Sequence, residues 1–258
     1  MDSRGYYDKL LKRNRNIIVE GIKMKELYEK YKSCIVQIIV KGCMGETASG
    51  AGFHIGDGYI VTARHVVENN IIELITGDSY ASQHVMTKKI FYPSNPKIDL
   101  AVLETDFSLG KSREKVDVIP LGGHLDDWIG EEFVLSRVVT FGYPRIPQSK
   151  EPVLVAAQGE INAIIDKYAS PHLHFIISSM ARGGFSGGPV ISEYDFLLGV
   201  FTESLTEGNQ PIENGFASVI SIEPLLVLLY ENSIRIEGVK YFDSSALCVL
   251  AHAAFNTF

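Results

Sequence analysis

A single hydroxyl, that of Ser186, lies among four glycines in the segment MARGGFSGGP at residues 180–189. Glycine permits tight turns and lets backbone amides come close to a ligand. A serine held in such a turn can attack a carbonyl carbon while neighbouring N–H groups stabilise the oxyanion. The pattern GxSGG also fits an ordinary glycine-rich turn, so its meaning depends on partners elsewhere in the chain.

A histidine and an aspartate supply the groups that such a serine needs. His65 follows the strand-like segment IVTA at 60–63, and Asp99 begins the apolar segment DLAVL at 99–103. A histidine titrates near neutral pH and can take the hydroxyl proton of Ser186. A carboxylate bonded to that histidine fixes its tautomer and stabilises its charged form. The three residues, in the order His, Asp, Ser, therefore predict a catalytic triad.

These motifs resemble those of the trypsin-like serine peptidases, which have the chymotrypsin fold. The residues that carry the resemblance are TARH at 62–65, DLAVL at 99–103 and GFSGGP at 184–189, and the similarity covers roughly residues 33–230. It is closest to the disulfide-free HtrA/Deg-like protease domain, here without a PDZ domain. The chain order fits this fold and differs from that of subtilisin or the α/β-hydrolases. The resemblance implies a serine endopeptidase that forms an acyl-enzyme intermediate with a protein or peptide substrate.

Short β-like segments separated by turn residues predict an all-β fold of two six-stranded antiparallel barrels, with the active site in the cleft between them. The first series is Ile35–Val40, Ser49–Ile55, Tyr59–Thr62, Ile71–Ile75, His84–Tyr92 and Leu100–Glu104; the second is Phe133–Phe141, Val153–Ile165, Leu173–Ile177, Val190–Ser192, Phe196–Phe201 and Phe216–Ile220. His65 and Asp99 then come from the first barrel and Ser186 from the second.

The chain divides into three predicted parts. These are an N-terminal helical arm (1–32), a peptidase domain (33–230, with barrels at about 33–108 and 131–221) and a C-terminal extension (231–258). The arm is expected to pack on the outside of a barrel or to dock a partner. The segment IEPLLVLLY at 222–230 predicts a helix with Pro224 in its first turn. For the extension we expect a strand and a docked C-terminal helix.

The backbone N–H groups of Gly184 and Ser186 are expected to form the oxyanion hole. The residue before the serine is Phe185, where digestive relatives have an aspartate that pairs with a newly cut N-terminus. We therefore expect no activation by that kind of cleavage. The loop at 181–185 would instead be ordered by packing or by a regulatory protein partner.

Four residues are candidates for substrate binding. Met180 stands where relatives that prefer Arg or Lys have an aspartate, so we expect an uncharged substrate residue before the scissile bond. Thr202, Glu203 and Ser204 end a predicted strand that would pair with the substrate backbone by β-addition. If Glu203 faces the pocket, its charge would restore a preference for basic residues.

Composition excludes several other classes of protein. A hydrophobic content of 46% and a charged content of 21% are typical of soluble globular domains. The net charge of −7 argues against a nucleic-acid or anionic membrane surface. The first 16 residues lack an apolar leader, and the apolar run at 246–255 is too short to span a bilayer. The three cysteines lack metal-binding spacing, so we expect no metal site. Their small, odd number does not indicate a disulfide framework, which predicts a cytoplasmic location. We also expect no cofactor.

Two alternatives remain open. The first is a catalytically latent peptide-binding module on the same fold, and the second is an esterase that uses the same triad, since a fold does not fix its substrate. Labelling of Ser186 by a fluorophosphonate probe would distinguish an enzyme from a binding module.

Overall fold

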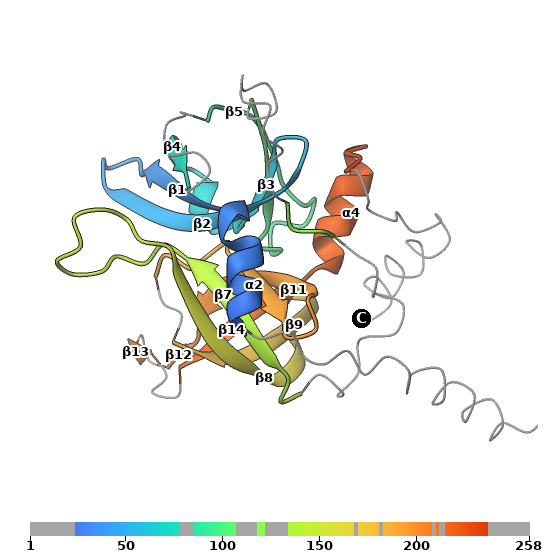
Figure 1. The fold of residues 1–258 in the computed structure, drawn as a ribbon. Coiled ribbons are helices and arrows are strands. Elements are labelled where there is room, and N and C mark those ends of the chain that lie inside the picture. The colour runs from blue at the N-terminus through green and yellow to red at the C-terminus, as the bar shows by residue number, and fades with distance from the viewer. Residues whose placement is uncertain are drawn as a thin grey trace, which may run out of the picture.

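The computed structural model describes residues 24–77, 85–106, 118–121, 134–167, 170–180, 183–207, 210–211 and 215–236. These residues form two six-stranded antiparallel sheets, and a small third sheet pairs β12 (Thr206–Glu207) with β13 (Gln210–Pro211). The sheet from the first half of the chain lies above the sheet from the second half in Figure 1. This arrangement confirms the predicted all-β fold with two six-stranded units of the chymotrypsin type.

The first sheet is a half-barrel with the strand order β4-β1-β2-β3-β6-β5. Its strands are β1 (Ile35–Lys41), β2 (Thr47–Gly56), β3 (Tyr59–Thr62), β4 (Ile71–Thr76), β5 (Thr87–Phe91) and β6 (Ala101–Thr105). The outer strands β4 and β5 do not pair with each other among the described residues, so this unit is more open than the barrel that we expected. Each outer strand has only one buried residue, which leaves little apolar surface to hold the two edges together.

The central strands of the first sheet carry buried residues on both faces, because alternate residues of a strand point to opposite sides. Val36, Ile38 and Val40 of β1 pack in the core of this sheet. Ile35 and Phe53 instead belong to a larger cluster that also contains residues of the second sheet. The two sheets therefore share a common apolar core.

The second sheet is a closed barrel with the strand order β10-β11-β14-β9-β8-β7. Its strands are β7 (Arg137–Gly142), β8 (Val155–Lys167), β9 (Ser170–Ser179), β10 (Pro189–Ser192), β11 (Leu197–Ser204) and β14 (Phe216–Ser221). Phe185 and Phe201 lie in its core with their ring centroids 6.2 Å apart. Ser186 follows Phe185 directly, so packing inside this barrel fixes the backbone beside it.

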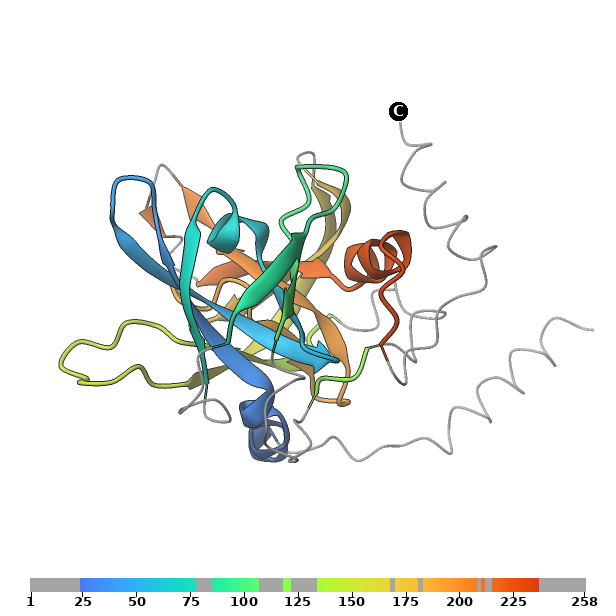
Figure 2. The ribbon, with the colours of Figure 1, turned by 90° about the horizontal axis from the view of Figure 1, so that it is seen from above.

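The helices among the described residues are α2 (Met24–Tyr31), the short 3₁₀ helix η1 (Lys32–Cys34), α3 (Arg64–Val67) and α4 (Glu223–Glu231). Helices α2 and α4 lie on the outside of the sheets (Figures 1 and 2). The Tyr31 hydroxyl donates to Asp195 at 2.7 Å, and the ring of Tyr28 stacks on Phe141, so α2 packs against the second barrel. Helix α4 occupies the segment predicted to be helical, with Pro224 in its first turn.

Several predicted elements lie outside the described residues. They include the arm before residue 24, most of the connection at 107–133, and the strand and helix expected beyond residue 236. Before that point, Ile234 and Ile236 are buried in the shared core. None of the helices in the described ranges has the length and apolar character needed to cross a membrane.

Candidate active site

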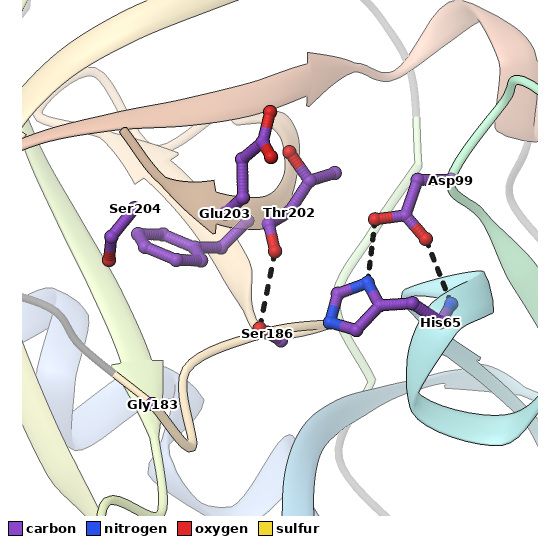
Figure 3. A pocket seen from close by; sticks show the side chains of 8 residues that line it. His65, Asp99, Gly183, Ser186, Thr202, Glu203 and Ser204 are labelled. Carbon is purple, nitrogen blue, oxygen red and sulfur yellow. Dashed lines mark hydrogen bonds and ion pairs between the residues drawn. The ribbon is translucent and has the colours of Figure 1, made fainter. Parts of the chain in front are cut away.

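His65 lies on the one-turn helix α3, directly after strand β3. Val66 and Val67 on the same turn are buried in the core of the first sheet and anchor it. Arg64 donates two hydrogen bonds to Glu68 across the turn, at 2.9 and 2.6 Å. The side chain of His65 is about half exposed (51%) and faces the space between the sheets (Figure 3).

Asp99 holds His65 by two hydrogen bonds. Its buried neighbours Ile98 and Leu100 fix the turn before β6, from which Asp99 points toward α3. One carboxylate oxygen accepts the backbone N–H of His65 at 2.9 Å, and the other bonds Nδ1 of the ring at 2.7 Å. The imidazole is thereby oriented with its second nitrogen directed toward Ser186 (Figure 3).

The environment of His65 favours its protonated form. The bond to Asp99 raises the pKa of His65 above its usual value, burial opposes this, and the negative charges of Asp99 and Glu203 add to the rise. A histidine with a raised pKa is a stronger base, as acceptance of a hydroxyl proton requires.

The glycine turn after Ser186 fits against the first sheet, which carries His65. Gly187 has φ +87, and a Cβ there would lie 2.3 Å from the carbonyl oxygen of Ala51 and 2.2 Å from Oγ1 of Thr62. Only glycine tolerates both this backbone conformation and this approach. The N–H of Ala51 also donates to the carbonyl of Ser186 at 2.8 Å. The motif thus joins the two sheets at the nucleophile.

The hydroxyl of Ser186 donates to the carbonyl of Thr202 at 3.2 Å. Among the described residues this carbonyl is its hydrogen-bond partner, and His65 is not. Thr202 lies at a β-bulge in β11, between Phe201 and Glu203, where the register with β14 shifts. A bulge redirects the groups beside it, and here it brings a backbone carbonyl to the nucleophile.

Gly184 has φ +98, and its carbonyl accepts the N–H of Tyr143 at 2.9 Å. A Cβ at this position would lie 2.4 Å from the carbonyl oxygen of Tyr143. Within the described part of the chain, the N–H groups of Gly184 and Ser186 have no acceptor. They are therefore available to a ligand. Sequence reasoning missed Tyr143 because no local pattern marks its contact with Gly184.

A cleft of about 470 Å³ contains the candidate residues (Figure 3). It is lined by His65, Asp99, Gly183, Ser186, Phe201, Thr202, Glu203 and Ser204. The structure thus brings together the three predicted catalytic residues and three of the four predicted substrate-binding residues. Met180, at the end of β9, is 74% exposed and is not part of this lining. Across the described residues, no group of three or more His, Cys, Asp or Glu side chains is placed to hold a metal ion.

The model of a protein family described as "Trypsin-like peptidase domain" matches residues 50–200 of the chain. These residues include all three members of the predicted triad. A curated relative from Chlamydia pneumoniae, described as a probable periplasmic serine endoprotease, DegP-like, is 31% identical over 188 residues. That match covers 67% of this chain and 32% of the relative, so the chain spans about a third of the relative's length.

Solved structures of proteases share the fold. The active form of the Rv3671c protease from M. tuberculosis superposes with a TM-score of 0.59 at 18% identity, covering 84% of this chain and 86% of that one. The HtrA-type protease AlgW, solved with a tripeptide, gives a TM-score of 0.60 at 15% identity, covering 83% of this chain and 64% of that one.

The predicted cytoplasmic location is wrong, because the curated relative is named as periplasmic. The prediction relied on the cysteines, and their number limits only the chance of a disulfide framework. Cys34 is buried and Cys43 is exposed, and both are free, so the fold described needs no disulfide between them in any compartment. The fold and the match over residues 50–200 agree: the chain belongs to the family of trypsin-like peptidase domains, as its motifs predicted.

Proposed function

We propose that the chain hydrolyses peptide bonds through a triad of His65, Asp99 and Ser186 and an acyl-enzyme intermediate. The observation that carries this proposal is the pair of hydrogen bonds that Asp99 accepts from the backbone N–H and the ring Nδ1 of His65, beside the hydroxyl of Ser186. With Nδ1–H bonded to the carboxylate, the other ring nitrogen keeps the lone pair that faces the serine.

Acylation begins with attack by Oγ of Ser186 on the scissile carbonyl carbon. His65 takes the hydroxyl proton during the attack and then gives it to the leaving amine as the C–N bond breaks. Asp99 stabilises the imidazolium formed between the two steps. A water molecule, deprotonated by His65, then hydrolyses the ester on Ser186 and restores the free serine.

The oxyanion hole consists of the N–H groups of Gly184 and Ser186. The two donors have no acceptor among the described residues, and the bond from Tyr143 to the Gly184 carbonyl holds this turn. Phe185, only 2% exposed, anchors the same turn in the barrel core. These contacts support packing as the cause of order at Gly184 and Phe185.

The substrate is an extended protein or peptide segment. Thr202, Glu203 and Ser204 line the cleft at the end of β11, where backbone pairing by β-addition would hold the chain next to Ser186. Met180 is 74% exposed and lies outside the cleft lining, so the preference for an uncharged residue before the scissile bond stays a prediction from the sequence. Glu203 does line the cleft, which is the condition under which we expected a preference for basic residues.

A binding event switches the site to its reactive form. In its absence the hydroxyl of Ser186 donates to Thr202 and not to His65. Catalytic hydrogen bonds are often long or misaligned without substrate and tighten in the complex. The same bond favours a second candidate, a latent peptide-binding module in which this arrangement persists.

Fluorophosphonate labelling tests the proposal. We expect the native protein to be labelled. In Ser186→Ala, labelling should disappear and peptidase activity should fall by about six orders of magnitude. Ser94→Ala, which changes an exposed serine near the first sheet, is the matched control and should be labelled normally. Labelling that requires an added peptide supports the switch.

Absence of labelling in folded protein, with or without peptide, contradicts catalysis and supports the binding module. Mass spectrometry of protein substrates then distinguishes a peptidase, which releases new termini, from an esterase, which does not.

A further inference from the structure

A groove of about 370 Å³ adjoins the glycine turn and shares no lining residue with the catalytic cleft. Its walls come from β1, β2 and the segment after β7: Gln37, Ile39, Thr47, Ala48, Ser49, Tyr143, Pro144, Arg145, Ile146, Ser149, Lys150, Glu151 and Pro152. Tyr143 in this wall bonds Gly184, and Ser49 lies two residues before Ala51, which bonds the carbonyl of Ser186. The groove therefore begins beside the proposed nucleophile.

One wall of the groove is formed by the strand pair β1 and β2, and β2 has an uncovered edge there. β2 pairs with β1 from Thr47 to Phe53, but its pairing with β3 begins only at Phe53. The N–H of Ala51 points to the edge of β2 away from β1. Since backbone groups alternate between the two edges of a strand, the N–H groups of Ser49 and Thr47 point to the same free edge. No described strand covers that edge at either residue. An extended peptide can add there by backbone hydrogen bonds.

The other wall carries charge. Arg145 and Lys150 are exposed, and neither forms an ion pair with any residue that the structure describes. Glu151 is the one carboxylate in the lining, so the groove has an excess of positive charge. The partly exposed Ile39 and Ile146 add apolar surface between the charges.

We propose that this groove binds the part of the substrate on one side of the scissile bond, and that Arg145 and Lys150 select an acidic residue there. The occupant is a substrate segment because the groove continues from the turn that holds Ser186 and offers a free strand edge. The acidic character follows from the two unpaired cations. This inference rests on the proposed function and adds a substrate class to it.

Paired peptides test the selection. In quenched fluorescent peptides with a fixed cleavage site, one residue is varied among Asp, Asn and Lys, position by position, on both sides of the bond. We expect kcat/KM to be about 1.5-fold to fivefold higher for Asp than for Asn at one or two positions on one side only. That range is typical of ion pairs between exposed charges. The preference should shrink at 0.5 M salt, because exposed charges are screened.

Variants assign the preference to residues. The double variant Arg145→Gln, Lys150→Gln should cut the Asp/Asn ratio to about one, and Glu151→Gln should raise it. Charge reversal with Arg145→Glu, Lys150→Glu should favour the Lys peptide. The matched control, Lys88→Gln with Arg235→Gln, removes two exposed cations outside the groove and should keep the native ratio.

Fluorophosphonate labelling of every variant separates this inference from the proposed function. A native protein that is labelled and cleaves peptides, but shows no charge preference or keeps it in the double variant, overturns the selection and leaves the triad intact. Loss of labelling in the native protein overturns both. If an uncleaved acidic peptide accelerates cleavage of a short substrate, the groove is a regulatory site and the substrate assignment is wrong.

Discussion

The two halves of the candidate site differ in how firmly their side chains are held. The first sheet supplies His65 with both its backbone N–H and its Nδ1 bonded to Asp99, at 2.9 and 2.7 Å. The second sheet supplies Ser186, whose hydroxyl makes one longer bond, of 3.2 Å, to a backbone carbonyl. The base is therefore fixed in two places, while the nucleophile is held at one.

At Ser186 the backbone is held more firmly than the side chain. The backbone of Ser186 is set by the barrel core through Phe185 and by the first sheet through Ala51. Its hydroxyl can still change partner by rotation about one bond, between staggered positions. In the proposed switch, a bound substrate shifts the hydroxyl from Thr202 to His65.

After the loss expected for Ser186→Ala, the largest effect comes from breaking the hold on His65 in the first half. Asp99→Asn should lower kcat/KM by about 10⁴, because the amide favours the wrong tautomer of His65 while keeping the shape of the site. Steady-state kinetics on a peptide substrate measures the loss. Asp106→Asn is the matched control, since Asp106 accepts a backbone N–H from Met86 at 2.8 Å in the same sheet. A loss below tenfold in Asp99→Asn would exclude Asp99 from the triad.

A smaller effect is expected from the glycine turn of the second half. Gly184→Ala should reduce kcat by about 10²–10³, because a Cβ 2.4 Å from the carbonyl of Tyr143 forces the turn to move and displaces one oxyanion donor. Gly45→Ala is the control: its φ is +88, so the strain is similar, but it lies in the β1–β2 turn and has room for a Cβ. Equal losses of kcat in both variants would mean that the Gly184 N–H has no role in the reaction.

Most of what sequence could predict here has a local cause. Short β-like segments between turn residues placed all twelve main strands, and Pro224 marked the start of α4, because both signals act within a few residues. The cluster of His65, Asp99 and Ser186 was predicted from three short motifs. Each motif includes the turn residues that hold its functional side chain. Three glycines around Ser186 explain why. A Cβ would lie 2.4 Å from the carbonyl oxygen of Tyr143 at Gly184, 2.3 Å from that of Ala51 at Gly187, and 2.0 Å from that of Phe141 at Gly188, so no other residue type fits.

What the sequence did not predict depends on distant contacts. Nothing local indicates that β4 and β5 stay apart, that the Thr202 carbonyl holds the serine, or that Tyr143 supports Gly184. The free strand edge at Ser49 depends on where the pairing of β2 with β3 begins, which is a property of the whole sheet. The prediction of the cellular location was wrong for another reason: cysteine content is only an indirect sign of the compartment.

The smallest expected effect concerns the charge that the second half places near the base. Glu203 raises the pKa of His65, after the larger contribution of Asp99. Since His65 acts as a base only when neutral, the rate falls as pH drops through its pKa. Glu203→Gln removes one cause of the raised pKa, so the acid side of the pH–rate profile should move to lower pH. At pH 6 the variant should keep a larger share of its maximal rate than the native enzyme keeps.

Two measurements sharpen this last prediction. The pH dependence of kcat/KM on an uncharged short peptide reports the change in the pKa of His65 through the reaction rate. NMR titration of the His65 ring in Ser186→Ala protein measures the same change directly. Glu160→Gln, an exposed glutamate on β8, should leave both unchanged. A shift to higher pH, or an equal shift in the control, would show that the Glu203 carboxylate does not act on the base. The two sheets would then be coupled at the turn of Ser186 alone, and electrostatics across the cleft would contribute nothing to the reaction.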